Sequence, residues 1–171
     1  MQTDQKKPID IKIHELSWLF TDAVGLYHLG RKYSSLLLLL CAVDALAKKV
    51  EPKNKGVRQR FEDYLMKNLP RHTNVQNFNI RVPKKNKTFR LENLLYKFLR
   101  NPIIHEGAHL DIRKPSIFSV YIDWTNGARY IQVDNELNRV VLGGDWLIDI
   151  LGGVVKDGLG ETLNKCNQGQ G

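Results

Sequence analysis

The feature that most constrains the fold is an apolar segment in the first third of the chain. Eight consecutive apolar residues run from Leu36 to Val43, and Asp44 ends the run. A helix that crosses a membrane needs about 20 apolar residues, so this segment is too short to be one. Because apolar residues continue on nearly every side as far as Val50, the segment predicts a buried, central helix.

Length and composition favour a single folded domain. The chain has 171 residues, of which 42% are hydrophobic and 26% are charged, close to the averages of soluble globular proteins. These values exclude wholesale disorder, and a domain of this size buries a core without disulfides or metal. We expect a flexible segment at residues 1–10, one domain at 11–159 and a flexible tail at 160–171.

The N-terminus and the cysteines bear on the cellular location. Residues 1–8 contain no apolar core, so they do not resemble a secretion signal. Cys41 lies in the apolar segment and Cys166 in a polar tail, so the two are not expected to form a disulfide. Together with the short apolar run, these features predict a cytoplasmic protein without membrane association.

Apolar residues spaced three and four apart predict further helices around the central one. Ser34 or Ser35 is a suitable cap for the central helix, and Pro52 is placed to end it. A polar loop is expected between the third and fourth helices, at residues 71–89. The expected helices cover approximately residues 11–31, 36–50, 55–68, 91–101 and 145–155.

A strand-like alternation interrupts the helical pattern after the fourth helix. One alternating run ends at Trp124, Asn126-Gly127 follows, and a second run ends at Val133. Asn-Gly between two such runs is a strong signal of a hairpin turn, so we predict a β-hairpin at about residues 117–134. The predicted fold class is therefore mainly α, a bundle of about five helices with a small β-hairpin inserted before the last one.

The segment that follows the fourth helix holds the residues best suited to chemistry, Arg100-Asn101-Pro102-Ile103-Ile104-His105. An imidazole that titrates near neutral pH can take a proton from a ribose 2′-OH or give one to a leaving 5′-oxygen. A guanidinium beside it can hold the scissile phosphate and stabilise the charge of the transition state. On an ideal helix the two would point roughly 140° apart, and Pro102 can bend the segment so that they meet. The structural alternative has Arg100 in a surface salt bridge and His105 at a helix end.

The segment from Leu94 to Gly107 resembles the signature helix of the HEPN family (higher eukaryotes and prokaryotes nucleotide-binding domains). The mark of that family is an arginine, a polar residue that is often asparagine, a few spacers and a histidine. The resemblance extends to the layout of residues 13–156, an all-helical bundle with the motif late in it. It implies a metal-independent endoribonuclease in which His105 is the general acid–base and Arg100 binds the phosphate.

The resemblance assigns roles to two further residues. Asn101 would position the phosphate or the ribose. Family members commonly carry an acidic residue on an earlier buried helix, where it orients the basic side chains of the motif, and Asp44 matches that position. Without such a partner, Asp44 would be an isolated carboxylate on an apolar helix, which costs free energy.

The resemblance also implies partners. Family members often dimerise so that two motifs line one cleft, and we therefore expect a homodimer that binds RNA or a nucleotide. This chemistry needs no cofactor. In a toxin- or defence-related role, an antitoxin protein would be a further partner. The non-enzymatic alternative is a relative that binds RNA or a nucleotide without cleaving it.

The net charge of +8 agrees with a nucleic-acid partner. A basic stretch leads directly into the helix that carries Arg100, and it could follow an RNA backbone if it folds over the motif. Tyr96 lies four residues before Arg100, on the same helical face, where it could line a cleft. A solvated loop is the structural alternative for the basic stretch. The predicted RNA-binding residues are Lys84, Lys85, Lys87, Arg90 and Tyr96.

A second motif overlaps the first, because His105-Glu106-Gly107-Ala108-His109 fits the H-E-x-x-H pattern. Histidines four apart on a helix share a face and can bind one zinc ion, with the glutamate as base for a bound water. Pro102 and Gly107 argue against an uninterrupted ligand helix, and no downstream motif marks a third ligand. A zinc metallopeptidase that uses His105 and His109 is therefore the second alternative.

Overall fold

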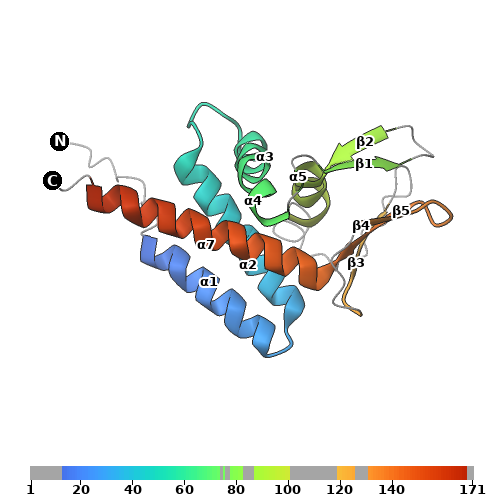
Figure 1. The fold of residues 1–171 in the computed structure, drawn as a ribbon, viewed down its shortest axis with the longest axis horizontal. Coiled ribbons are helices and arrows are strands. Elements are labelled where there is room, and N and C mark those ends of the chain that lie inside the picture. The colour runs from blue at the N-terminus through green and yellow to red at the C-terminus, as the bar shows by residue number, and fades with distance from the viewer. Residues whose placement is uncertain are drawn as a thin grey trace, which may run out of the picture.

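The computed structural model describes residues 13–73, 75, 78–82, 87–100, 119–125 and 131–168. Within these ranges the chain is mainly helical, as the apolar spacing predicts (Figure 1). The long helices are α1 (Ile13–His28), α2 (Lys32–Val50), α3 (Val57–Asn68) and α7 (Gly144–Gln168). Shorter helical pieces are α4 (Pro70–Thr73), α5 (Leu91–Leu94) and the π-helix η2 (Leu95–Arg100).

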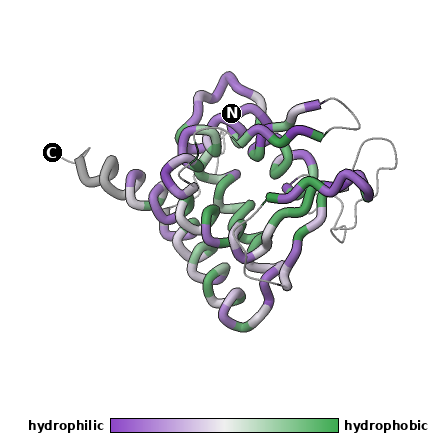
Figure 2. Tube along the Cα trace, turned by 45° about the vertical axis from the view of Figure 1, so that its right-hand side comes forward, coloured by the Kyte–Doolittle hydropathy of each residue, from purple (hydrophilic) through white to green (hydrophobic). Residues whose placement is uncertain are grey.

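The predicted central helix is the centre of the helical layer. α2 packs against α1, α3 and α7, and the hydrophobic parts of these helices face one another (Figure 2). Its fully buried leucines include Leu36, Leu40 and Leu46. The apolar run is therefore buried by neighbouring helices, and across the described residues no helix combines the length and the apolarity needed to cross a membrane.

The start of α2 differs from the prediction, because neither Ser34 nor Ser35 caps it. The helix begins at Lys32, and Ser35 is fully buried inside it. Gly30 has a φ of +74°, which a glycine adopts at little cost, and Arg31 N–H donates to the carbonyl of Leu26. This ending of α1 reverses the chain within a few residues, so the turn decides where α2 starts.

The last helix is longer than predicted, since α7 continues to Gln168 through residues expected to form a flexible tail. The helix continues through its glycines. One of them, Gly158, lies where α7 comes close to the side chains of Tyr64 and Leu46. A Cβ atom at Gly158 would overlap the Tyr64 hydroxyl and would lie 3.0 Å from Leu46 Cδ1. Helix-weakening glycine is thus compatible with α7 because tertiary packing stabilises the helix.

The predicted polar loop at 71–89 is wrong in part, because it contains an antiparallel hairpin. Strands β1 (Asn79–Val82) and β2 (Lys87–Arg90) pair with Ile80 opposite Phe89 and Val82 opposite Lys87. Ile80 and Val82 are buried while Asn79 and Arg81 are exposed. The period-two alternation is therefore present but covers only four residues of a mostly polar stretch.

The predicted hairpin at 117–134 is also wrong. β3 (Ser119–Asp123) and β4 (Ile131–Asp134) do not pair with each other, since β5 (Arg139–Gly143) lies between them. β5 runs parallel to β3 and antiparallel to β4. Asn126-Gly127, the expected turn, lies outside the described residues.

The hairpin turn that the structure contains lies between β4 and β5. Asp134 Oδ1 accepts a hydrogen bond from Leu137 N–H at 3.0 Å, Asp134 Oδ2 accepts one from Arg139 Nε at 3.0 Å, and Asn138 has a φ of 48°. An aspartate that binds a later backbone N–H is a typical turn signal. β5 takes the central position of the sheet, and its residues Val140 and Leu142 are fully buried. Buried backbone N–H and C=O groups need hydrogen-bond partners, and a central strand finds them on both of its edges.

Candidate functional site

The structure describes only part of the predicted catalytic set. Arg100 and Asp44 lie in described elements, whereas Asn101, His105 and His109 lie outside the described residues. Among the predicted RNA-binding residues, Lys87, Arg90 and Tyr96 are described, and Lys84 and Lys85 lie outside. The geometry below therefore concerns the arginine end of the motif and the basic hairpin.

Arg100 is the last residue of η2, and its side chain reaches α2. Its Nη2 donates a hydrogen bond to Asp44 Oδ2 at 2.9 Å, across a sequence separation of 56 residues. The Arg100 side chain is 8% exposed and the Asp44 side chain 29%. The structural alternative of a surface salt bridge is therefore wrong, because the guanidinium is buried against the central helix.

The helix that carries Arg100 is positioned by its apolar face. The apolar residues spaced at three and four along α5 and η2 are buried, as the sequence predicts. The segment is nevertheless a π-helix from Leu95 to Arg100, and such turns are often found at functional sites. The burial of this face fixes where the chain arrives at Arg100, immediately before the remainder of the motif. The buried apolar residues are Leu91, Leu94, Leu95, Phe98 and Leu99.

Tyr96 forms the second contact of the Arg100 guanidinium. The Arg100 Cζ atom lies 5.3 Å from the centre of the Tyr96 ring, within the range of a cation–π interaction. The Tyr96 ring in turn lies 5.5 Å from the ring of Phe61 on α3. The guanidinium therefore contacts Asp44 of α2 and Tyr96 of its own helix, and Phe61 of α3 packs against that Tyr96 ring.

Cys41 lies one turn before Asp44 on α2 and is a free, half-buried cysteine. Burial raises the pKa of its thiol, and the Asp44 charge adds to that effect, while Arg100 acts in the opposite direction. A thiol whose pKa is raised is protonated at neutral pH and is a poor nucleophile. Cys41 therefore contributes packing beside the ion pair.

The arrangement allows a defined set of chemical roles. A guanidinium has five N–H donors in a rigid planar fork, which suits the oxygens of a carboxylate or a phosphate. A guanidinium fixed in position can bind a phosphate oxygen without first losing side-chain entropy. Asp44 and Arg100 thus form an ion pair that fixes the guanidinium at the end of η2.

The β1–β2 hairpin carries further positive charge. Its two strands contain Arg81, Lys87 and Arg90 and no acidic residue. Arg90 lies 3.6 Å from Glu92, whereas Arg81 and Lys87 form no ion pair within the part of the chain that the structure describes. The hairpin is therefore a basic surface next to the element that leads to Arg100.

Sequence reasoning did not identify a groove beside this hairpin. The groove has a volume of about 510 Å³ and includes Phe78 and Trp146, whose ring centres are 5.8 Å apart. The alternation of Phe78, Ile80 and Val82 is the signal that could have indicated a strand with one apolar side. The two aromatic residues are far apart in sequence, so their contact is a product of the fold.

The zinc alternative has no support within the described ranges. There, no group of three or more histidine, cysteine, aspartate or glutamate residues is placed to hold a metal ion. His105 and His109, the two histidines of the H-E-x-x-H pattern, are outside these ranges.

Comparison with known proteins gives no assignment. No protein-family model matches the chain, and neither a curated protein nor a solved structure is significantly similar to it.

Proposed function

We propose that this protein is a metal-independent endoribonuclease of the HEPN type. Arg100 binds the scissile phosphate, Asn101 positions the phosphate or the ribose, and His105 is the general acid–base. Asp44 orients Arg100. The observation that carries the proposal is the 2.9 Å hydrogen bond between Arg100 and Asp44, two residues that the family resemblance assigns to one site.

The choice of partner for Asp44 supports this assignment. Lys48 is one turn away on α2 and is exposed, whereas Arg100 comes from a distant element and is buried. Placing a charged arginine in a buried position costs free energy that a single ion pair offsets only in part. A partly buried ion pair that precedes a motif of reactive residue types is consistent with a positioned functional group.

The proposed reaction is a transesterification within the RNA strand. His105 takes the proton of the ribose 2′-OH, and the 2′-oxygen forms a bond to phosphorus while the bond to the 5′-oxygen breaks. The protonated His105 then gives this proton to the leaving 5′-oxygen, which leaves a 2′,3′-cyclic phosphate and a 5′-hydroxyl and returns His105 to its neutral form. Arg100 stabilises the negative charge that accumulates on the phosphate oxygens.

The basic hairpin supports an RNA substrate. Arg81 and Lys87 are exposed on β1 and β2, and neither has a carboxylate partner among the described residues. Cations of this kind bind phosphates by releasing counterions, so RNA binding is expected to weaken steeply as salt rises. A cytoplasmic homodimer, in which two motifs line one cleft, belongs to the same proposal.

The direct test is cleavage of labelled single-stranded RNA in the presence of EDTA. We expect the wild-type protein to cleave, and His105→Ala and Arg100→Ala to lose activity by about 10²- to 10⁴-fold. Arg58→Ala is the matched control, because Arg58 forms an exposed ion pair with Glu62 on α3, at 2.7 Å. Activity that EDTA abolishes, or that survives in both motif variants, contradicts the proposal.

One observation favours a second candidate, an RNA-binding module without turnover. The Arg100 side chain is 8% exposed, so its main interactions are with the protein. In this alternative Arg100 supports the fold and the basic hairpin binds the RNA. Salt-sensitive RNA binding without cleavage, which persists in His105→Ala, would favour it, whereas stoichiometric zinc lost in His109→Ala would favour the peptidase alternative.

A further inference from the structure

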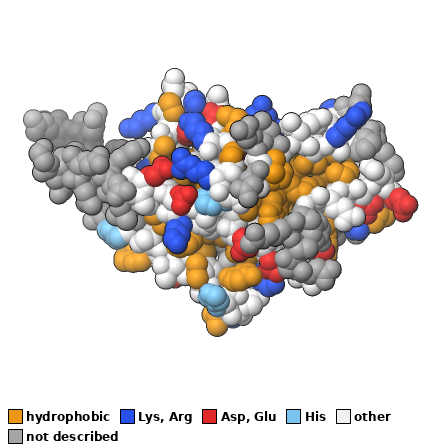
Figure 3. Space-filling model, viewed as in Figure 1, with side chains coloured by type: hydrophobic (Ala, Val, Ile, Leu, Met, Phe, Trp, Pro, Cys, Tyr) orange, Lys and Arg blue, Asp and Glu red, His pale blue; other side chains and the backbone are white. Residues whose placement is uncertain are grey.

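A groove separates the β1–β2 hairpin from the edge strand β4. It has a volume of about 510 Å³, within the range of pockets that bind small ligands. In the space-filling view it is a hollowed hydrophobic strip next to the hairpin (Figure 3). The side chains that line it are His72, Thr73, Val75, Phe78, Asn79, Ile80, Arg81, Ile131, Val133 and Trp146.

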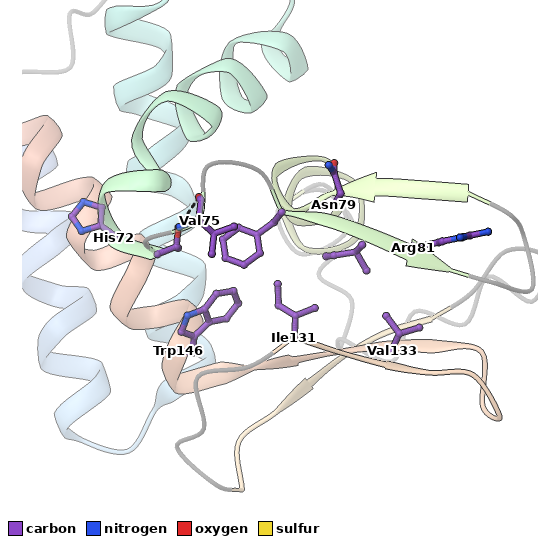
Figure 4. Close-up of a pocket in the computed structure, with 10 residues that line it drawn as sticks. His72, Val75, Asn79, Arg81, Ile131, Val133 and Trp146 are labelled. Atoms are coloured by element: carbon purple, nitrogen blue, oxygen red, sulfur yellow. Dashed lines mark hydrogen bonds between the residues drawn. The ribbon is translucent and has the colours of Figure 1, made fainter.

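The groove exists because two small sheets approach each other without joining. β1 and β4 lie close together but belong to separate hydrogen-bonded sheets. Ile131 and Val133 point from β4 toward β1, and Trp146 lies at one end, where α7 begins (Figure 4). No residue of β4 is fully buried, so its apolar side chains remain available to a ligand.

The chemical character of the groove is that of an apolar slot with a cationic rim. Phe78 and Trp146 meet edge to face at 5.8 Å, so they hold each other in place. Arg81 lies at the end away from Trp146 (Figure 4), and none of the described residues that line the groove carries a carboxylate. His72 lies at the opposite end, where its Nε2 is 3.1 Å from Asp157 on α7. An occupant with a flat apolar part and a negative charge fits both features.

We propose that this groove binds one unpaired nucleotide, with its base between β1 and β4 and its phosphate at Arg81. Single-stranded RNA is recognised in this way, by insertion of a splayed base against aromatic and apolar side chains. Among the described lining residues, Arg81 is a cation and none is a carboxylate, which favours an anionic ligand over a cationic one. The choice of RNA as the source of this nucleotide rests on the proposed function. It adds a base-binding position separate from the Arg100–Asp44 pair.

The experiment measures binding with two probes. One is a single-stranded 2′-O-methyl oligonucleotide that contains 2-aminopurine and cannot be cleaved, because its 2′-oxygen is blocked. The other is adenosine monophosphate. Val133→Trp fills the groove from β4, and its matched control is Val24→Trp on the exposed side of α1, where Val24 is 40% exposed. Arg81→Ala removes the charge from the rim, with Arg58→Ala as control.

We expect Val133→Trp to weaken oligonucleotide binding by about 10-fold or more and to abolish the change in 2-aminopurine fluorescence. Arg81→Ala should weaken binding of both probes by about fivefold and make it less sensitive to salt. The two control variants should bind like the wild-type protein. If Val133→Trp loses its folded circular dichroism signal, the loss of adenosine monophosphate binding in Arg81→Ala decides, because Arg81 is exposed and weaker oligonucleotide binding alone is also expected from the basic hairpin.

The outcomes separate this inference from the proposed function. RNA cleavage by the wild-type protein, with unchanged binding in both groove variants, overturns the groove and leaves the ribonuclease in place. Adenosine monophosphate that binds to the wild-type protein and not to Val133→Trp supports the groove even if no RNA is cleaved. Failure of both probes to bind the wild-type protein overturns the inference.

Discussion

The helical layer and the strand region of this protein are built in different ways. In the helical layer, α2 buries eight residues and is in contact with three other long helices. In the strand region, β4 buries none of its residues, and β3 pairs with β5 rather than with the next strand in the chain. The helices therefore form the packed frame of the molecule, whereas β4 is an edge strand whose side chains are only partly buried.

Both candidate sites lie where these regions meet. Arg100 is the last residue of η2, which packs on α2 and α3. In the chain, η2 follows the β1–β2 hairpin, with α5 between them. Trp146 begins α7 and also lines the groove beside β4. One hydrophobic cluster nevertheless joins the regions, since it contains Leu40 and Phe61 together with Val140 and Leu142.

The largest effect is expected from truncation in the shared core. Phe61→Ala should lower the free energy of unfolding by about 4 kcal/mol and Leu142→Ala by about 3 kcal/mol, because both side chains are fully buried. Urea denaturation followed by circular dichroism and by tryptophan fluorescence measures both. If the helical layer and the strand region unfold together, the circular dichroism and fluorescence transitions coincide in each variant.

Val57→Ala is the control, because Val57 is 45% exposed and its truncation should cost less than about 1 kcal/mol. A Leu142→Ala protein in which the fluorescence transition precedes the helical one would contradict a single cooperative core. It would instead mean that the strand region unfolds on its own.

The next effect concerns the ion pair that joins the regions. Asp44→Ala leaves the buried Arg100 guanidinium without that carboxylate and should lower the free energy of unfolding by about 2 kcal/mol. Asp44→Leu combined with Arg100→Met should recover part of the loss, since no buried charge remains. Chemical denaturation measures both variants.

Glu161→Ala is the matched control for the ion pair. Its partner Arg71 is 55% exposed and Glu161 is 51% exposed, so the loss should stay under about 0.5 kcal/mol. An Asp44→Ala variant as stable as Glu161→Ala would show that the Arg100–Asp44 pair does not stabilise the fold.

A smaller effect is expected at the boundary between β5 and α7. A Cβ atom at Gly144 would overlap the ring of Trp124, so Gly144→Ala should cost about 1 to 2 kcal/mol and shift the tryptophan fluorescence. Gly25→Ala on α1 is the matched control, because nothing lies within 4 Å of its added methyl group. That variant should be more stable by about 0.5 to 1 kcal/mol, as alanine favours a helix. Equal thermal melting of the two variants would contradict the tight contact.

The smallest effects are two pH dependences of opposite sign. Burial raises the pKa of Glu92 on α5 above its ordinary value, although Arg90 opposes the shift. The folded protein therefore holds this proton more tightly than the unfolded chain, and the ionised carboxylate is destabilising at neutral pH. Glu92→Gln should raise the free energy of unfolding at pH 7 by up to about 1 kcal/mol and should have no such advantage below about pH 4.

Asp134, in the turn between β4 and β5, gives the opposite sign. The hydrogen bond from Leu137 N–H, with a contribution from Arg139, lowers the pKa of Asp134. Its stabilising effect is present above the unfolded pKa and is lost as the pH falls through the folded one. Asp134→Asn should therefore be less stable than the wild-type protein at pH 7, and the difference should narrow in acid. Parallel pH–stability curves for Glu92→Gln and Asp134→Asn would contradict both assignments.

The sequence by itself determined the helical layer. The apolar run from Leu36 predicts a buried central helix, and the spacing of Leu91 to Leu99 predicts the buried face that precedes Arg100. Both predictions are confirmed, because helical periodicity is a local property of neighbouring residues. A resemblance to a family motif, rather than periodicity, led to the pairing of Arg100 with Asp44, and the structure brings these two side chains into contact.

The strand order and the groove could not be predicted from the sequence and are seen only in the tertiary structure. Asn126-Gly127 indicated a hairpin, but β5 lies between β3 and β4 because its buried residues favour a central position. The contact of Phe78 with Trp146 likewise joins residues distant in the chain. Pairing between strands depends on which segments meet after folding, so the local Asn-Gly signal was not sufficient to predict it.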